Sequence, residues 1–386
     1  MKVLYIIDSF QIGGAERSLL DITSNLPGAE VVVCGVYKRD DLLQEFIKRG
    51  INIYHLSING KYNWRKAFKE ISKVVDREKP DIIHGTLFRS CILSRFIGRK
   101  YKLPVINSIV SDSYGEERLS SMHPVRRAKH YYTFLLDKIT SGKVNLFISN
   151  SNAVKRSYSS RLGISESKIV TIYRGREAGK YIKSVNSEKV KKEVSPQYNL
   201  EGHFVFVCVG RLVESKGHLL LLQAFKQLSL KYPNTSLLIV GEGPFRREIE
   251  EYISSNNLEA NTILLGNRND IPSLLNISDA FVTSTYYEGL SGAIIEAMFS
   301  NLPIIASDIE PNLELVGDDR GWTFKKGDWS ELYDKMELLL QNHGDSKLKV
   351  EKAFKFANLH LEISAVTKKY LDTYRNLIDE NTVSRH

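Results

Sequence analysis

The sequence predicts two α/β domains in tandem, each a doubly wound parallel sheet with helices on its faces. Short β-branched runs alternate with helical patterns along almost the whole chain, and one polar stretch near the middle interrupts this rhythm. Strands that alternate with helices form right-handed crossover units, which build parallel sheets. The length of 386 residues agrees with this division, because it exceeds what one ordinary hydrophobic core accommodates.

The first series begins with a strand over 2–8 and a helix that ends near Asn25. The same alternation continues to residue 173. Further strands are predicted at 30–36, 51–56, 81–84, 104–110, 145–149 and 169–173, with helices near Leu42 and over 64–76. Doubly wound sheets bind ligands at the carboxyl ends of their strands. Residues that directly follow these runs are therefore the candidates for a site.

A polar stretch from about Glu177 to Gly202 separates the two series and is typical of a domain boundary. The strands of the second series are predicted at 203–210, 236–241, 262–266, 279–285, 302–307 and 321–324, and the pattern after Trp329 is helical only. We expect a first domain over 1–180, a second over 181–365, and a C-terminal helix and tail over 366–386 that returns to the first domain.

The composition favours an anionic partner. The net charge is +9, and the stretch 89–143 has eleven Lys or Arg against four acids, which gives 11 − 4 = +7. Such an excess indicates a phosphate-bearing ligand, an anionic membrane surface or nucleic acid. No zinc-finger, RNA-recognition or basic-zipper pattern accompanies it, so we predict no nucleic-acid partner.

Two other features bear on the class of protein. The three cysteines are far apart and lack metal-ligand spacing, so we interpret them as packing thiols and expect no metal site. No apolar run approaches the roughly 18 residues that span a bilayer. Asp8 ends the N-terminal apolar run before it reaches the length of a signal-peptide core. We expect a cytoplasmic protein.

The segment 126–139, RRAKHYYTFLLDKI, is predicted to be a helix with cations at one end and aromatic and aliphatic side chains behind them. Such a helix can lie on the anionic inner face of a membrane, with its aromatic rings at the headgroup level. A core-facing helix with a solvated basic edge has the same pattern. Both interpretations stay open at this stage.

The segment 287–297, YEGLSGAIIEA, follows a strand and opens a helix. Its two acids, Glu288 and Glu296, lie on either side of the helix N-terminus, where free amides and the positive end of the dipole suit a phosphate. Such a pair can hold the hydroxyl groups at both ends of a nucleotide sugar. A turn acid and an acid on a solvated helix face would give the same spacing.

The segment 209–225, VGRLVESKGHLLLLQAF, places two cations in a loop after a buried strand. Arg211 and Lys216 project from the carboxyl end of that strand, where their charges can neutralise a diphosphate leaving group without a metal ion. Two solvated loop cations are the alternative.

Together these segments resemble a known family. The matching stretches are VGRLVESKGH, LLIVGEGPFRREIE, ILLGNRNDI, YYEGLSGAIIEAM and LPIIASDI, which cover essentially the whole second series in order. They are similar to the motifs of the retaining glycosyltransferases of family 4. The resemblance implies the GT-B fold, in which two Rossmann-like domains face each other across a cleft. It also implies transfer of a hexose-type sugar from a nucleotide diphosphate donor to a glycan or a polyprenyl-diphosphate-linked acceptor in surface polysaccharide synthesis, with no cofactor.

The resemblance also implies roles for individual residues of the second domain. Arg211 and Lys216 would bind the donor diphosphate, Glu296 the ribose hydroxyls, and Glu288 the transferred sugar. The remaining donor-binding candidates line the phosphate turn or the base and ribose pocket: Gly289, Leu290, Ser291, Gly292, Gly241, Gly243, Asn267 and Arg268. Many members have Glu-Gly-Phe-Gly at the turn, whereas this chain has Glu-Gly-Leu-Ser, so the identity of the donor sugar is not inherited.

In the first domain, Gly13 and Gly14 precede a helix that contains Glu16. A glycine pair after a first strand lets the backbone approach a phosphate or a sugar, although a plain strand-to-helix turn has the same form. Within the family this loop looks like the one that closes over donor phosphate or acceptor. We expect donor contacts from the glycines and acceptor contacts from Glu16.

His84 ends a predicted strand, where a neutral imidazole would point into the cleft and hydrogen-bond a sugar hydroxyl or developing charge. We predict catalytic and acceptor contacts for it, beside the catalytic candidates Arg211, Lys216 and Glu288. Arg174 and Arg176 lie near the predicted hinge and would meet donor phosphate or acceptor, or form ion pairs between the two domains. We assign Arg174 to the acceptor.

Three other functions remain compatible with the fold. A glycan phosphorylase would need a pyridoxal-phosphate lysine, and a nucleotide-sugar epimerase would work without an acceptor. A non-catalytic nucleotide-sugar-binding protein would bind donors without hydrolysing them.

Overall fold

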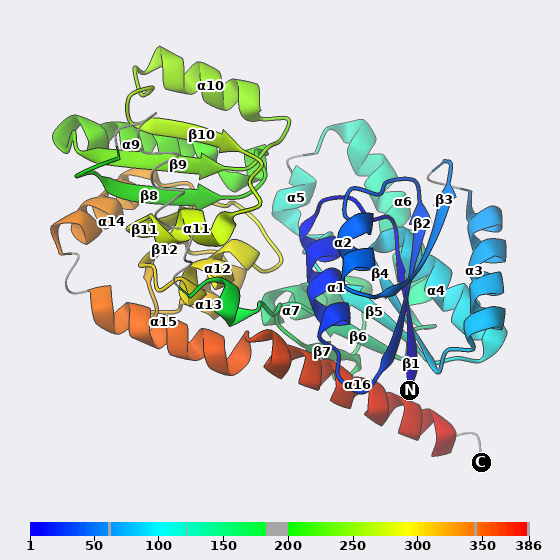
Figure 1. Cartoon of the computed structure of the whole chain (residues 1–386). Coiled ribbons are helices and arrows are strands. Elements are labelled where there is room, and N and C mark those ends of the chain that lie inside the picture. Colours follow the sequence, from blue (N-terminus) through cyan, green and yellow to red (C-terminus); the bar gives the residue numbers. More distant parts are fainter. Residues whose placement is uncertain (61–62, 121, 183–199, 343–345, 384–386) are drawn as a thin grey trace. The chain divides into compact units, whose positions relative to one another are not determined.

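A computed structural model describes residues 1–60, 63–120, 122–182, 200–342 and 346–383 (Figure 1). The chain divides into two compact units, one made of Met1–Gly175 with Glu362–His386 and the other of Arg176–Leu361. Most of the polar stretch that the sequence marks as the domain boundary, 183–199, lies outside the described residues. Each unit contains one parallel sheet, so the predicted pair of Rossmann-like domains is confirmed.

The first unit has a seven-stranded sheet in the order β3-β2-β1-β4-β5-β6-β7. Its strands are β1 (Lys2–Ile7), β2 (Glu30–Tyr37), β3 (Asn52–Ile58), β4 (Ile82–Thr86), β5 (Val105–Ile109), β6 (Leu146–Ser149) and β7 (Ile169–Thr171). Its helices are α1 (Gly14–Ser24), α2 (Leu43–Lys48), α3 (Trp64–Glu78), α4 (Phe88–Tyr101), α5 (Glu116–Ser120), α6 (Pro124–Ser141), α7 (Asn152–Leu162) and α16 (Ile363–Val383). The strand order reverses between β1 and β4, which is where such sheets place a ligand.

The last helix, α16, packs on the first unit, as the sequence predicts. Val366, Tyr370 and Tyr374 are buried in the same core as Val3 and Tyr5 of β1. The Tyr374 hydroxyl is 2.7 Å from that of Tyr5. Burial of this apolar face removes it from water, which is the main reason that a helix at the end of the chain stays with a sheet formed at its beginning.

The second unit has a six-stranded parallel sheet in the order β10-β9-β8-β11-β12-β13. Its strands are β8 (Phe204–Val209), β9 (Thr235–Val240), β10 (Thr262–Gly266), β11 (Ala280–Thr283), β12 (Ile304–Ser307) and β13 (Trp322–Phe324). Its helices are α9 (His218–Lys231), α10 (Arg246–Ser255), α11 (Ile271–Asn276), α12 (Gly292–Phe299), α13 (Glu310–Val316), α14 (Trp329–Gln341) and α15 (Lys347–His360). The strands at the centre of this sheet are nearly continuous buried apolar runs because helices cover both faces.

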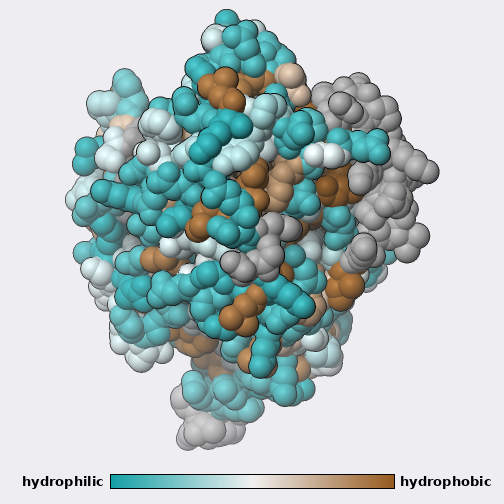
Figure 2. Space-filling model, turned by 90° about the vertical axis from the view of Figure 1, so that its left-hand side faces the viewer, coloured by the Kyte–Doolittle hydropathy of each residue, from teal (hydrophilic) through white to brown (hydrophobic). Residues whose placement is uncertain are grey.

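Hydrophobic side chains are scattered in small groups among hydrophilic ones on the face of the molecule that Figure 2 shows. Isolated surface hydrophobics of this kind are ordinary in folded proteins. Within the described residues, no helix combines the length and the apolar character that crossing a membrane requires.

Candidate active site

The predicted turn and helix at 287–297 form as expected. Ser291 is the N-cap of α12, and its hydroxyl accepts a hydrogen bond from the Ile294 N–H at 3.3 Å. Leu290 is fully buried, so it anchors the turn in the core. The first amides of α12 are therefore presented by a capped and anchored turn, which is the local geometry that binds anions.

Lys216 and Glu288 meet although 72 residues separate them in the sequence. The ammonium Nζ of Lys216 donates a hydrogen bond to Glu288 Oε1 at 2.7 Å. Gly217, which follows Lys216, has a φ of +66°, and a Cβ there would collide with the Ser284 carbonyl. Glycine thus lets the loop after β8 lie directly on the end of β11. The other carboxylate oxygen, Glu288 Oε2, has no hydrogen-bond partner among the described residues.

Arg211 lies in the same loop, exposed, and the described part of the chain gives it no ion pair. The loop is held by backbone hydrogen bonds on both sides. The Gly210 N–H donates to the Val240 carbonyl at 2.9 Å, and the Leu212 N–H donates to the Glu242 carbonyl at 3.0 Å. Arg211 therefore projects a cation from a fixed backbone at the carboxyl end of β8.

Gly241 and Gly243 support the loop that carries Arg211. A Cβ on Gly241 would collide with the Gly210 carbonyl, and a Cβ on Gly243 would collide with the Leu212 carbonyl. Close approach of two backbones explains both glycines physically. The contact with the nucleotide base that the resemblance implies for them stays a prediction.

Arg268 is engaged with a neighbour in the sequence. Its guanidinium makes two hydrogen bonds to the Asp270 carboxylate, at 2.8 and 2.7 Å. Hydrogen bonding to Arg268 lowers the pKa of Asp270, which keeps the carboxylate ionised. The pair fixes the loop between β10 and α11, where Asn267 also lies, and donor contacts by these two residues stay a prediction.

Arg176, for which the sequence allowed either a ligand contact or an ion pair, binds Glu296. Arg176 Nε donates to Glu296 Oε1 at 2.8 Å, and both side chains are largely buried. Arg176 also lies against Gly292, because a Cβ there would collide with its Nη2. Arg176 thus forms an ion pair inside the second unit, along the first turns of α12.

Four predicted residues of the first unit come together at the N-terminus of α1. The Glu16 carboxylate folds back against Gly13, where a Cβ would collide with it, and Glu16 is only 2% exposed. The Arg174 guanidinium lies 3.2 Å from the position that a Cβ on Gly14 would take. Arg174 also donates to the Val110 carbonyl at 3.3 Å. The Glu16 and Arg174 side chains therefore lie close over the two glycines.

His84 is buried rather than open to solvent. It is 1% exposed, with Nδ1 at 2.6 Å from the Tyr374 hydroxyl and Nε2 at 2.7 Å from the Ser108 hydroxyl. Burial lowers the pKa of His84 to about 3, so the imidazole is neutral. The physical reason is α16, which covers the end of β4 and engages one ring nitrogen. His84 joins β4, β5 and α16, and its contact with the acceptor stays a prediction.

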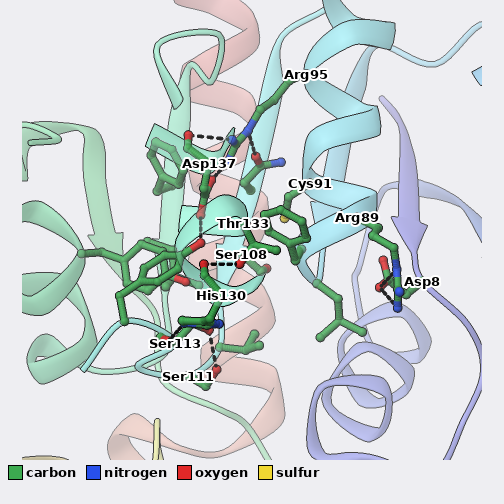
Figure 3. Close-up of a pocket in the computed structure, with 18 of the residues that line it drawn as sticks. Asp8, Arg89, Cys91, Arg95, Ser108, Ser111, Ser113, His130, Thr133 and Asp137 are labelled. Carbon is green, nitrogen blue, oxygen red and sulfur yellow. Dashed lines mark hydrogen bonds and ion pairs between the residues drawn. The ribbon is translucent and has the colours of Figure 1, made fainter. Parts of the chain in front are cut away.

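A polar cavity of about 320 Å³ lies in the first unit beside the ends of β4 and β5 (Figure 3). Hydroxyl groups and charged side chains from several elements line it. The labelled residues include Ser108, Ser111, Ser113, Thr133, His130, Asp8 and Arg89. Asp8 and Arg89 pair across its edge at 2.9 Å. Such a mixture of neutral hydrogen-bonding groups and paired charges suits a ligand rich in hydroxyl groups.

A buried ion pair forms one wall of this cavity. Arg95, 2% exposed, pairs with Asp137 at 2.7 Å and donates further hydrogen bonds to Asn107 and Thr140. Asp137 also accepts a hydrogen bond from the Tyr114 hydroxyl at 2.7 Å. Each charge is thus neutralised and fully hydrogen-bonded, which is the condition for a stable buried pair.

Helix α6 exposes both apolar and cationic side chains. Tyr131, Tyr132 and Ile139 are each about two-thirds exposed, and Val125 is 60% exposed. The buried residues of α6 are limited to Asp137 and Thr140. The interpretation of this segment as an ordinary core-facing helix therefore fails for most of its apolar side chains. Next to it, Leu119, Tyr131, Phe134, Arg127 and Arg161 contribute to a second cavity of about 340 Å³.

Comparison with known proteins identifies the family. The model of glycosyl transferases group 1 matches residues 190–356, and that of glycosyltransferase family 4 matches residues 12–178. The chain belongs to the group 1 glycosyltransferases. The predicted family is thereby confirmed.

Two bacterial glycosyltransferases are among the similar proteins. This glycosyltransferase is 29% identical to UDP-Gal:alpha-D-GlcNAc-diphosphoundecaprenol alpha-1,3-galactosyltransferase of Escherichia coli over 258 residues, which are 66% of this chain and 64% of that protein. It is 29% identical to the capsular polysaccharide biosynthesis glycosyltransferase CapH of Staphylococcus aureus over 322 residues, 82% of this chain and 83% of that one. The first match thus spans slightly under two-thirds of the Escherichia coli enzyme.

Solved structures agree on the fold. Anabaena HepE in complex with UDP-glucose superposes with a TM-score of 0.84, at 19% identity, over 97% of this chain and 100% of that one. At this identity the match shows a common GT-B fold and nothing further.

Sequence reasoning missed several residues of this glycosyltransferase. Arg95, Tyr114 and Asp137 were not singled out, because a cation or an acid within a helical pattern is normally solvated. The only sequence feature that pointed to this region was the excess of positive charge over 89–143. The described residues contain no group of three or more His, Cys, Asp or Glu side chains placed to hold a metal ion.

Proposed function

We propose that the protein transfers a hexose-type sugar from UDP to a saccharide carried on a lipid diphosphate, with retention at the anomeric carbon, in the synthesis of a surface polysaccharide. The observation that carries this proposal is the Lys216–Glu288 pair beside exposed Arg211. It combines cations for a leaving diphosphate with a carboxylate for a sugar. This is the chemistry that a nucleotide-sugar donor requires.

The donor site acts by positioning and charge stabilisation. The bond between the anomeric carbon and the diphosphate oxygen breaks, and negative charge develops on the oxygen that leaves. Arg211, Lys216 and the first amides of α12 stabilise that charge. The acceptor hydroxyl forms the new bond on the same face, and its proton passes to the departing diphosphate. Glu288 Oε2, which has no partner among the described residues, accepts a hydrogen bond from a sugar hydroxyl.

Relatives support the classes of donor and acceptor. The name of the Escherichia coli enzyme specifies a UDP-sugar and a diphosphoundecaprenol-linked acceptor, and that of CapH specifies capsular polysaccharide. HepE was solved with UDP-glucose. We extend these ligand classes, but no specific sugar or linkage, to the present chain.

The polar cavity of the first unit is the acceptor pocket in this proposal. Its volume of about 320 Å³ suits a small saccharide, and Ser111, Ser113 and Thr133 line it with the Asp8–Arg89 pair. Neutral and paired groups of this kind bind hydroxyls without attracting free ions. The exposed face of α6 is the attachment surface, because its aromatic side chains and cations match an interfacial helix on anionic lipid.

A donor panel tests the reaction. We expect UDP and UDP-hexoses to raise the melting temperature of the purified protein more than GDP or ADP sugars, since a ligand that binds only the folded state stabilises it. The best donor should be hydrolysed slowly alone and consumed faster with an undecaprenyl-diphosphate saccharide. Conversion of the donor to an isomeric nucleotide sugar without acceptor would instead indicate an epimerase. Binding without any turnover would indicate a non-catalytic binding protein.

Vesicle sedimentation tests the attachment surface. We expect the protein to co-sediment with vesicles of 30% phosphatidylglycerol far more than with neutral vesicles, and less at high salt, because surface charges are screened. The double variant Tyr131→Ser, Tyr132→Ser should lower the bound fraction several-fold, by roughly 1–3 kcal/mol of lost burial. Lys347→Ser and Lys352→Ser, in α15 of the second unit, serve as a control. Equal binding by wild type and the tyrosine variant would refute this surface.

A further inference from the structure

Arg176 is a charged side chain of the second unit to which the proposed reaction gives no role. It is only 7% exposed. Its backbone N–H donates to the Leu361 carbonyl at 2.9 Å, which fixes its main chain at the end of α15. Burial of a guanidinium costs several kcal/mol of desolvation unless its hydrogen bonds and charge are matched. The position of this side chain is therefore well determined and energetically expensive.

The guanidinium lies along the first turns of α12. Nε donates to Glu296 Oε1 at 2.8 Å, and Nη2 occupies the space that a Cβ on Gly292 would need. A cation at the positive end of a helix is disfavoured by the helix dipole. The ion pair with Glu296 offsets this cost. An arrangement with an unfavourable component persists where it serves another requirement of the site.

The ion pair engages Oε1 of Glu296 and does not involve Oε2. The side chain of Glu296 is 14% exposed, and among the described residues Oε2 accepts no hydrogen bond. A glutamate without a partner samples several rotamers, and ordering it on ligand binding costs affinity. A charge-assisted hydrogen bond to Oε1 removes that cost beforehand. Glu296 is thus oriented before a ligand arrives.

We infer that Arg176 is a positioning residue, which holds the Glu296 carboxylate so that Oε2 accepts hydrogen bonds from the ribose hydroxyls of the donor nucleotide. This inference rests on the proposed donor site. It differs from a purely structural tie between Arg176 and α12, because a structural tie has no connection with the ribose hydroxyls. A nucleotide that lacks these hydroxyls therefore separates the two roles.

The experiment compares UDP with 2′,3′-dideoxy-UDP by calorimetric titration of the full chain. We expect Arg176→Met to weaken binding of UDP by about tenfold, in the range for a hydrogen bond to a charged group, and binding of the dideoxy form by less than about twofold. Equal weakening of both nucleotides would overturn the inference. Arg176→Leu, which also removes both the charge and the hydrogen-bond donor, gives the same comparison if the methionine variant is poorly folded.

A double-mutant cycle shows whether Arg176 acts through Glu296. In a Glu296→Gln background, Arg176→Met should change the affinity for UDP by less than about twofold, because the two residues act as one unit. Additive losses would contradict the inference. Lys231→Met is the matched control, since it removes another ion-paired cation of the second unit, 2.8 Å from Glu337, and should leave both affinities unchanged. Failure of the wild type to bind UDP, GDP or ADP would refute the proposed function itself.

Discussion

Replacement of Lys216 by alanine is expected to lower kcat/KM by about 10²–10³, the range measured when one group that stabilises developing negative charge is removed. The substitution deletes a cation at the carboxyl end of β8 and leaves the Glu288 carboxylate without its partner at 2.7 Å. That carboxylate would then repel the leaving diphosphate instead of being neutralised. Initial-rate measurements with the best donor of the panel test this expectation.

Lys231→Ala is the control for the Lys216 variant, because Lys231 forms an ion pair with Glu337 on the exposed surface of the same unit. Its turnover should stay within about twofold of wild type, since exposed pairs contribute little. Circular dichroism and the melting temperature establish that both variants are folded. Near-normal turnover by a folded Lys216→Ala protein would show that the leaving group departs elsewhere.

Replacement of Arg95 by methionine is expected to destabilise the first unit by about 3–5 kcal/mol, the usual result of removing one partner of a buried ion pair. Asp137 would remain buried with its charge uncompensated, and the hydrogen bonds to Asn107 and Thr140 would be lost. Because Arg95 also lines the polar cavity, the KM for the acceptor should rise while slow hydrolysis of the donor continues. Urea titration followed by hydrogen exchange in peptides of the first unit measures the stability.

Arg99→Met tests the specificity of that result, because Arg99 lies on the same helix, α4, with an exposed side chain. It should change the free energy of unfolding by less than about 0.5 kcal/mol, as surface substitutions do. Arg95→Met combined with Asp137→Asn should regain part of the lost stability, since the second change removes the uncompensated charge. A loss no larger in Arg95→Met than in Arg99→Met would contradict the role assigned to this pair.

Local patterns were sufficient to predict the strands, the helices and the loops that carry the donor motifs. The turn before α12 and the loop after β8 formed where the sequence placed them, because capping residues, glycines and buried apolar runs act over a few neighbouring residues. The direction of the sheets followed from the alternation of strands with helices. The return of the C-terminal helix was also expected, although its partners were not.

The pairing of charges was decided by the tertiary structure. Arg176 and Glu296 are 120 residues apart, and no local pattern indicates which of several cations would lie against α12. In the sequence, Arg95 and Asp137 look like solvated helix residues. In the structure, α4 and α6 pack together beside the polar cavity and bury the pair. Electrostatic partners depend on which distant surfaces meet, and sequence spacing does not contain that information.

His84 is the clearest example of a side chain whose burial the sequence did not predict. The sequence predicted that it ends a strand, whereas β4 continues for two residues beyond it, to Thr86. Whether such a side chain is open or covered depends on α16, which begins 279 residues later and places the Tyr374 hydroxyl 2.6 Å from Nδ1. For this protein the sequence by itself determined two parallel-sheet domains, the family, and the loops of the proposed donor site. Only the tertiary structure decided which of the candidate side chains are covered and which charges are neutralised, because burial is a property of the packed elements together.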